Sequence, residues 1–148
     1  MTAANEMTPL SRVILIGLLV GFLLNLTGWL GNNIILGSMW DDLGNGLTPV
    51  PWRESIWSDA FSLVPDFVYG FAIAWMIVKV RTMYVSTVSA SVSVGVFISL
   101  VGGVTTYFAI ANSGFVPWKL AFASFVLVIT CKVPLAILAG RLLFRESS

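Results

Sequence analysis

Two ionisable side chains, Asp66 and Lys132, stand in long apolar stretches of the sequence. Each costs about 2.5–3.5 kcal/mol when it is placed at the centre of a membrane-spanning helix. A charge kept at that cost is a candidate for the path of an ion or a substrate. Other interpretations are that the two side chains pair with each other, that Lys132 extends to the nearer membrane surface, or that they contact a partner subunit. Asp66 follows Pro65 and would also suit the cap of a helix start or kink.

Two further polar residues fall at the same depth as Asp66. A helix rises about 1.5 Å per residue, so Asn25, Asp66 and Ser99 lie about 20 Å from the basic residues that flank their helices. Lys132 lies about one turn closer to its own flank, a gap that a lysine side chain can cover. The sequence therefore predicts an intramembrane polar layer made of Asn25, Asp66, Ser99 and Lys132.

Few other residues are suited to catalysis or metal binding. The chain has no histidine, which is the commonest metal ligand and the usual general base near neutral pH. Its single cysteine, Cys131, cannot form an internal disulfide or a Cys-x-x-Cys pair. A serine–lysine dyad would need Ser99 or Ser124 beside Lys132, and nothing marks either serine as a nucleophile. We therefore expect no catalytic residue, no metal site and no cofactor, and so no enzyme.

The composition predicts that these residues lie in a membrane protein. Of 148 residues, 57% are hydrophobic and 10% are charged, and the mean hydropathy is +0.93. An ordinary soluble domain has about 25% charged residues, and a net charge of +1 offers no basic surface for nucleic acid. A crossing helix needs about 20 apolar residues. We expect one transmembrane domain, residues 1–148, with an all-α fold: an integral membrane four-helix bundle with helices near 10–30, 60–80, 84–108 and 120–140.

The basic residues predict how the helices cross the membrane. With an even number of helices both termini lie on one side, and cytoplasmic flanks are enriched in lysine and arginine. The opposite side carries only Arg53 and Lys119, whereas the terminal side carries Arg12, Lys79, Arg81, Arg141 and Arg145. We therefore expect a multi-pass protein of a bacterial inner (plasma) membrane, with both termini in the cytoplasm.

The connection at residues 31–59 is predicted to lie on the outer side. From Trp52 onward, Ile56 and Phe61 follow at helical spacing on one face. This pattern predicts a short interfacial helix that lies on the membrane surface and enters the second span near Pro65. A loop that only covers the end of the bundle is the alternative.

Small residues recur four positions apart along each predicted helix. Residues at this spacing share one face of a helix, and in lipid such faces let helices approach closely. The predicted helix-packing residues are Gly17, Gly21, Gly70, Gly95 and Gly140.

One set of residues extends from the first predicted helix to the last. It consists of Gly17-x-x-x-Gly21-x-x-x-Asn25, Trp40, Tyr69-Gly70, Trp75, Lys79, Arg81 and Gly140-Arg141-Leu142. On these residues the chain resembles a group of small uncharacterised four-helix integral membrane proteins of bacteria. The resemblance implies the architecture and carries no activity or ligand.

These observations predict a non-catalytic integral membrane subunit or scaffold that packs against itself or a larger membrane complex. Its partners would be membrane lipid and further copies or subunits, and no nucleic acid. The alternative is a small oligomeric transporter or channel in which Asp66, Lys132 and Asn25 line the path. A third hypothesis is a lipid- or pigment-binding protein that uses its aromatic residues without histidine ligation.

Overall fold

The computed structural model describes residues 10–44 and 56–144, with only the backbone course for 56–62. Within these ranges every regular element is helical, which confirms the predicted all-α class. The long helices are α1 (Leu10–Leu30), α3 (Ile56–Val80), α4 (Thr87–Gly103) and α6 (Trp118–Leu143). The shorter elements are the π-helical turns η1 (Gly31–Ile35) and η4 (Val104–Phe108), the 3₁₀ turn η3 (Arg81–Met83), and the helices α2 (Gly37–Gly44) and α5 (Ala109–Asn112).

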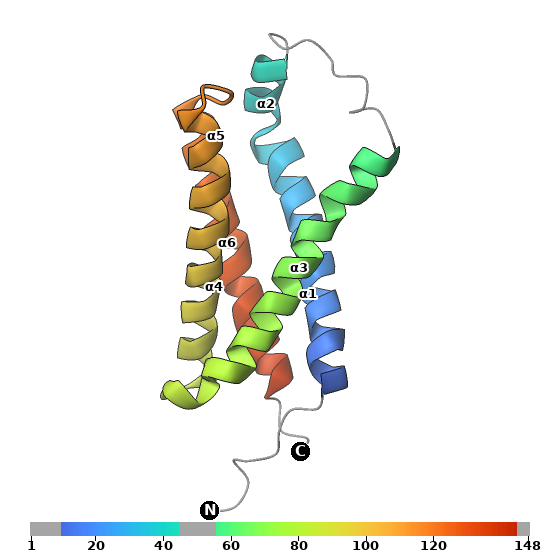
Figure 1. Cartoon of the computed structure of the whole chain (residues 1–148), viewed down its shortest axis with the longest axis vertical. Coiled ribbons are helices and arrows are strands. Elements are labelled where there is room, and N and C mark those ends of the chain that lie inside the picture. The colour runs from blue at the N-terminus through green and yellow to red at the C-terminus, as the bar shows by residue number, and fades with distance from the viewer. Residues whose placement is uncertain (1–9, 45–55, 145–148) are drawn as a thin grey trace, which may run out of the picture.

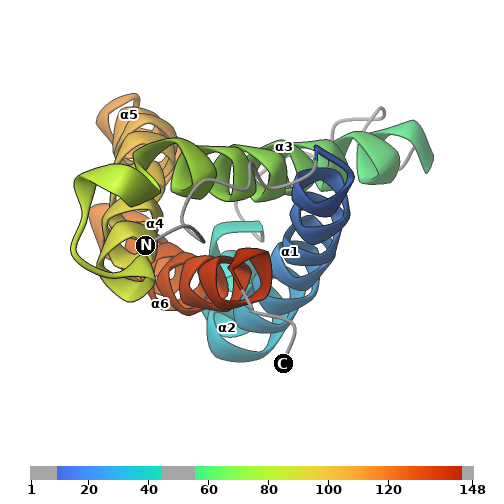
Figure 2. The same ribbon diagram turned by 90° about the horizontal axis from the view of Figure 1, so that it is seen from below.

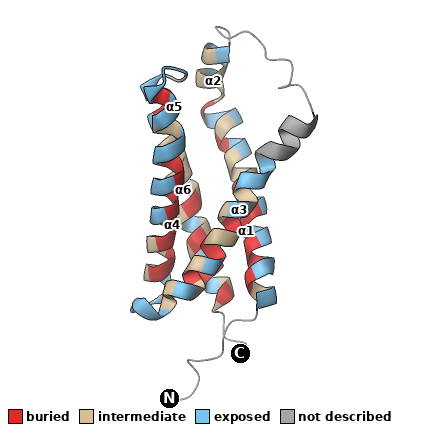
Figure 3. Cartoon of the chain, viewed as in Figure 1, coloured by how far each residue is buried: buried red, intermediate tan, exposed pale blue. Residues whose placement is uncertain are grey.

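Four stretches of the described chain are long and apolar enough to cross a membrane. They are Leu10–Ile35, Leu63–Met83, Thr87–Asn112 and Trp118–Leu143. Figure 3 shows buried and exposed residues alternating along each of these helices, so that each helix has a buried and an exposed side. The exposed residues include large apolar side chains such as Phe22 and Phe122. So much exposed apolar surface suits contact with lipid, because in water it would favour association.

The long helices form two antiparallel hairpins, α1 with α3 and α4 with α6 (Figure 1). Seen along the bundle, α1 lies opposite α4, and α3 lies opposite α6 (Figure 2). Further contacts join α1 to α6 and α3 to α4, so the helices close a ring. We call the end that holds Leu10 and Leu143 the terminal end, and the end that holds α2 and α5 the far end.

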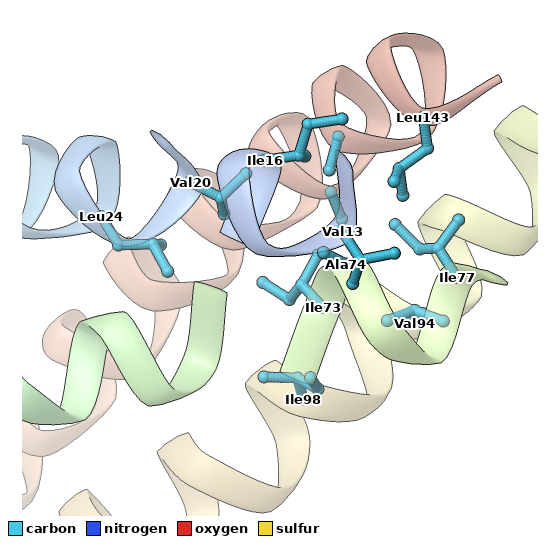
Figure 4. Close-up of a cluster of buried hydrophobic side chains, with 12 residues drawn as sticks. Val13, Ile16, Val20, Leu24, Ile73, Ala74, Ile77, Val94, Ile98 and Leu143 are labelled. Carbon is cyan, nitrogen blue, oxygen red and sulfur yellow. The ribbon is translucent and has the colours of Figure 1, made fainter. Parts of the chain in front are cut away.

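The hydrophobic core lies toward the terminal end. Each long helix contributes to it, and α3 crosses the bundle so that it leaves α4 toward the far end (Figures 1 and 4). At the terminal end the guanidinium of Arg12 also donates a hydrogen bond to the carbonyl of Leu142, at 2.6 Å. This end is therefore closed by packing. Its buried core consists of Val13, Ile16, Val20, Leu24, Ile73, Ala74, Ile77, Val94, Ile98, Ala136, Ala139 and Leu143.

The connection between α1 and α3 differs from the prediction. Its short helix is α2, and the residues from Ile56 onward belong to α3, which continues through Pro65. The predicted separate surface helix is therefore wrong from Ile56 onward, while Trp52 lies outside the described residues. A surface helix and the end of a spanning helix can both have an apolar face with helical spacing, so this pattern does not distinguish between them. A proline is tolerated inside such a helix when neighbouring groups satisfy the backbone.

Glycines let the helices of each hairpin approach to backbone contact. A Cβ atom added at Gly70 of α3 would lie 2.8 Å from the Cα of Gly21 in α1. A Cβ at Gly95 of α4 would lie 2.9 Å from the Cα of Val133 in α6. The other predicted packing glycines also lie against a neighbouring helix, so each predicted small-residue face lies at a helix contact. These are Gly17 against Phe71, Gly21 against Phe67, and Gly140 against Ser91.

The close approach at Gly70 predicts a specific loss of stability. Gly70→Ala should lower the free energy of unfolding by about 1–3 kcal/mol, because the new methyl group overlaps the α1 backbone. Gly28→Ala is the matched control, since its Cβ would lie 3.8 Å from the nearest side-chain atom. Reversible unfolding in mixed micelles measures both variants. Equal stabilities would contradict the proposed backbone contact.

Candidate functional site

A cavity of about 310 Å³ lies between the two hairpins in the far half of the bundle. Its walls come from α1 and η1, α3, α4 and η4, and α6. Most of the lining is apolar, and the closed core lies below it toward the terminal end. The polar side chains on its walls are Asn32, Asp66, Tyr69, Thr106, Tyr107 and Lys132.

Lys132 reaches this cavity from α6 and is only 5% exposed. Its Nζ atom lies 3.4 Å from the centroid of the Tyr69 ring. A desolvated ammonium over an aromatic face gains about 2 kcal/mol, which offsets part of the cost of burial. Tyr69 fits here because Gly102 in α4 has no side chain: a Cβ there would lie 2.6 Å from the tyrosine hydroxyl oxygen. Lys132 therefore points across the bundle toward α3, not along α6 to the surface.

Asp66 lines the same cavity from α3 and is half-buried. Its carboxylate attracts the Lys132 ammonium through space, but the two groups form no ion pair in the described part of the chain. None of the described residues donates a hydrogen bond to this carboxylate. Because α3 begins at Ile56, Asp66 lies inside the helix and caps neither end. Its oxygens remain free to accept hydrogen bonds from a bound molecule.

Asn25 and Ser99 do not join Asp66 and Lys132 at the cavity. The Asn25 amide donates to the carbonyls of Gly21, at 3.0 Å, and Leu63, at 3.2 Å, and so links α1 to α3. Ser99 is fully buried and donates to the carbonyl of Gly95 at 2.7 Å. The predicted polar layer therefore separates into two residues at the cavity and two that stabilise helices. Depth along a helix does not specify which face a side chain occupies.

Sequence reasoning missed the tyrosines of the cavity. Tyr69 follows Asp66 by three residues and so shares its helix face, a spacing that would have identified it. Tyr107 lies in η4, close enough to Asp66 and Tyr69 to interact with both electrostatically. Single π-helical turns occur often at functional sites, but periodicity in the sequence does not reveal them.

The other π-helical turn, η1, connects the cavity wall to α2. Asn32 in η1 donates to the carbonyl of Gly28 at 2.9 Å. Its side-chain oxygen accepts a hydrogen bond from the indole of Trp40 in α2, at 3.2 Å. Trp40 thus ties the short helix of the connection to a cavity wall.

Comparisons with models of protein families, with curated proteins and with solved structures give no match for this chain. The interpretation of the cavity accordingly follows from its geometry and chemistry.

The contact between Lys132 and Tyr69 predicts a measurable coupling. In a double-mutant cycle of Lys132→Met and Tyr69→Leu, the coupling should be about 0.5–2 kcal/mol, because each single change removes the cation–π contact. Tyr69→Phe, which keeps the ring, should retain most of the coupling. The free energy of unfolding in mixed micelles is the measurement. Additive effects of the two changes would show that the contact contributes nothing to stability.

Proposed function

We propose that this chain is an integral membrane protein that binds a small polar solute in its cavity and carries it across the bilayer. The Asp66 carboxylate carries the proposal: it lines a cavity between apolar helices, and no described residue donates a hydrogen bond to it. A membrane protein that keeps an ionisable side chain without an internal partner usually uses it on a ligand or ion. Cavities with few polar groups on mostly apolar walls are typical of solute sites.

The proposed membrane orientation follows from the basic residues. Arg12, Lys79, Arg81 and Arg141 belong to the terminal end of the bundle, whereas Lys119 belongs to the far end. An excess of lysine and arginine marks the cytoplasmic side. In a bacterial inner membrane both termini would then lie in the cytoplasm, and the cavity would lie in the outer half of the bilayer.

Carriage would require the two hairpins to part at the terminal end. The buried core closes this end, so in the described arrangement the cavity is separated from the cytoplasmic side. Alternating access in small carriers is largely a rocking of one helical unit against the other around a fixed site. The hairpins α1–α3 and α4–α6 are the natural units, because each is held by backbone contacts at its glycines.

The non-catalytic scaffold or subunit role remains the competing prediction. It would account for the glycine-mediated packing, but it assigns no use to an Asp66 carboxylate that accepts no hydrogen bond from the described residues. The prediction that further copies or a larger complex surround the chain likewise remains a prediction, and it too assigns no use to this carboxylate. A test of water access to the cavity separates the solute-binding role from a purely structural one.

The only cysteine of the chain is a built-in reporter of this access, since Cys131 lines the cavity. A charged methanethiosulfonate reagent added outside intact cells should modify Cys131, because the water that fills the cavity would carry the reagent to the thiol. The matched control is Thr130→Cys in a Cys131→Ser background. Thr130 lies next to it on α6 but on the outward surface, where lipid would keep the thiol unreactive.

Modification is measured as the loss of thiols available to a maleimide after denaturation. Equal rates at the two positions, or no reaction at either position from either face of the membrane, would contradict a solute cavity open to water. Reaction only from the cytoplasmic face of inverted vesicles would preserve the cavity and reverse the proposed orientation.

A further inference from the structure

The two hairpins repeat the same contact between helices. A Cβ atom added at Gly21 of α1 would lie 3.2 Å from the carbonyl oxygen of Asp66 in α3. A Cβ atom added at Gly95 of α4 would lie 3.4 Å from the carbonyl oxygen of Lys132 in α6. The same added Cβ atoms would lie 2.7 Å from the Cα of Phe67, which follows Asp66, and 2.9 Å from the Cα of Val133, which follows Lys132. Asp66 and Lys132 therefore occupy equivalent positions in the two hairpins.

Two further features follow the same repeat. The first helix of each hairpin ends in a π-helical turn, η1 after α1 and η4 after α4. A rotation by half a circle about the long axis of the bundle exchanges the places of α1 and α4 and those of α3 and α6 (Figure 2). At the level of these glycine contacts the hairpins are thus related by an approximate two-fold axis that passes between them, whereas beyond it η4 packs against α6 and η1 makes no comparable contact with the described residues of α3. Asp66 and Lys132 carry opposite charges on opposite sides of this axis and line one cavity.

This arrangement discriminates between kinds of ligand. A simple cation in the cavity is attracted by Asp66 and repelled by Lys132, and a simple anion meets the reverse. In surroundings of low dielectric constant the two effects are of similar size and nearly cancel. A molecule that carries both charges gains from both residues. The carboxylate has unused acceptor sites, and an ammonium group has three N–H donors, which a cation–π contact does not exhaust.

We propose that the cavity binds a zwitterion, with its cationic group at Asp66 and its anionic group at Lys132. This inference rests on the proposed solute-binding function and names its substrate class. A cavity of about 310 Å³ holds a molecule the size of a short-chain amino acid, and its apolar walls accommodate the aliphatic part.

The zwitterion can come from two sources. One is a free amino acid that enters from water at the far end. The other is the headgroup of a zwitterionic phospholipid that enters sideways between α3 and η4. Cavity residues on those two elements, Pro65 and Thr106, are exposed, so the cavity wall is not closed there by packing.

Protection of Cys131 from thiol modification tests the proposal in the purified full-length protein. The soluble probes are δ-aminovalerate, pentylamine and valerate, which share one chain length and differ in charge. The zwitterion should slow the modification at about tenfold lower concentration than either single-charge probe. For the lipid source, nanodiscs of phosphatidylethanolamine are compared with nanodiscs of phosphatidylglycerol, and slower modification in the former identifies a headgroup ligand.

The approximate symmetry provides a sharper second test. Asp66→Asn and Lys132→Met should each abolish the advantage of the zwitterion over the single-charge probes. The exchange Asp66→Lys with Lys132→Asp should restore it, because a zwitterion can bind in the reversed direction between equivalent positions. If the exchanged protein does not fold, the two single variants still decide the result.

The outcomes separate this inference from the function on which it rests. If Cys131 reacts but single-charge probes protect it as well as the zwitterion does, the substrate class is wrong while the cavity stands. The same conclusion follows if no probe and neither lipid protects it. If Cys131 does not react at all, the solute-binding function itself fails.

Discussion

The cost of holding a carboxylate and an ammonium between apolar helices is the constraint on which this structure depends. An isolated charge in such surroundings loses its hydration, and only a partner, an aromatic face or a polar cavity can compensate for it. Lys132 has the ring of Tyr69 and the field of Asp66. Asp66 has the cavity and the attraction of Lys132. The burial of both charges is thus made tolerable by one cavity, which the four long helices surround.

Glycine contacts hold together each of the two hairpins that enclose that cavity. The backbones of α1 and α3 touch at Gly70, and those of α4 and α6 touch at Gly95, so each hairpin is a compact unit. Interhelical packing in lipid depends on van der Waals contact, and each pair of helices across the surface between the two hairpins makes fewer contacts than the pair within a hairpin. At the terminal end large apolar residues fill that surface. Toward the far end α3 leaves α4, and the polar residues line what remains.

The candidate site was only partly predictable from the sequence. Asp66 and Lys132 stood out because ionisable residues are rare in apolar stretches. Asn25 and Ser99 were grouped with them by depth, yet their hydrogen bonds go to backbone carbonyls of their own helix or its neighbour. Tyr69 was missed because a tyrosine in an apolar stretch has no distinctive pattern. Its role comes from a lysine far away in the sequence and from the space left by Gly102.

Composition and the length of the apolar stretches were enough to predict an all-α chain with four helices able to cross a membrane, because lipid leaves backbone groups no partner outside a helix or a closed barrel. The folded arrangement alone reveals the rotation of each helix about its axis. It also reveals the continuation of α3 through Pro65 and the meeting of Asp66 with Lys132 across one cavity. These features depend on contacts between residues that are distant in the chain, and a local pattern of apolar and small residues is compatible with several such arrangements.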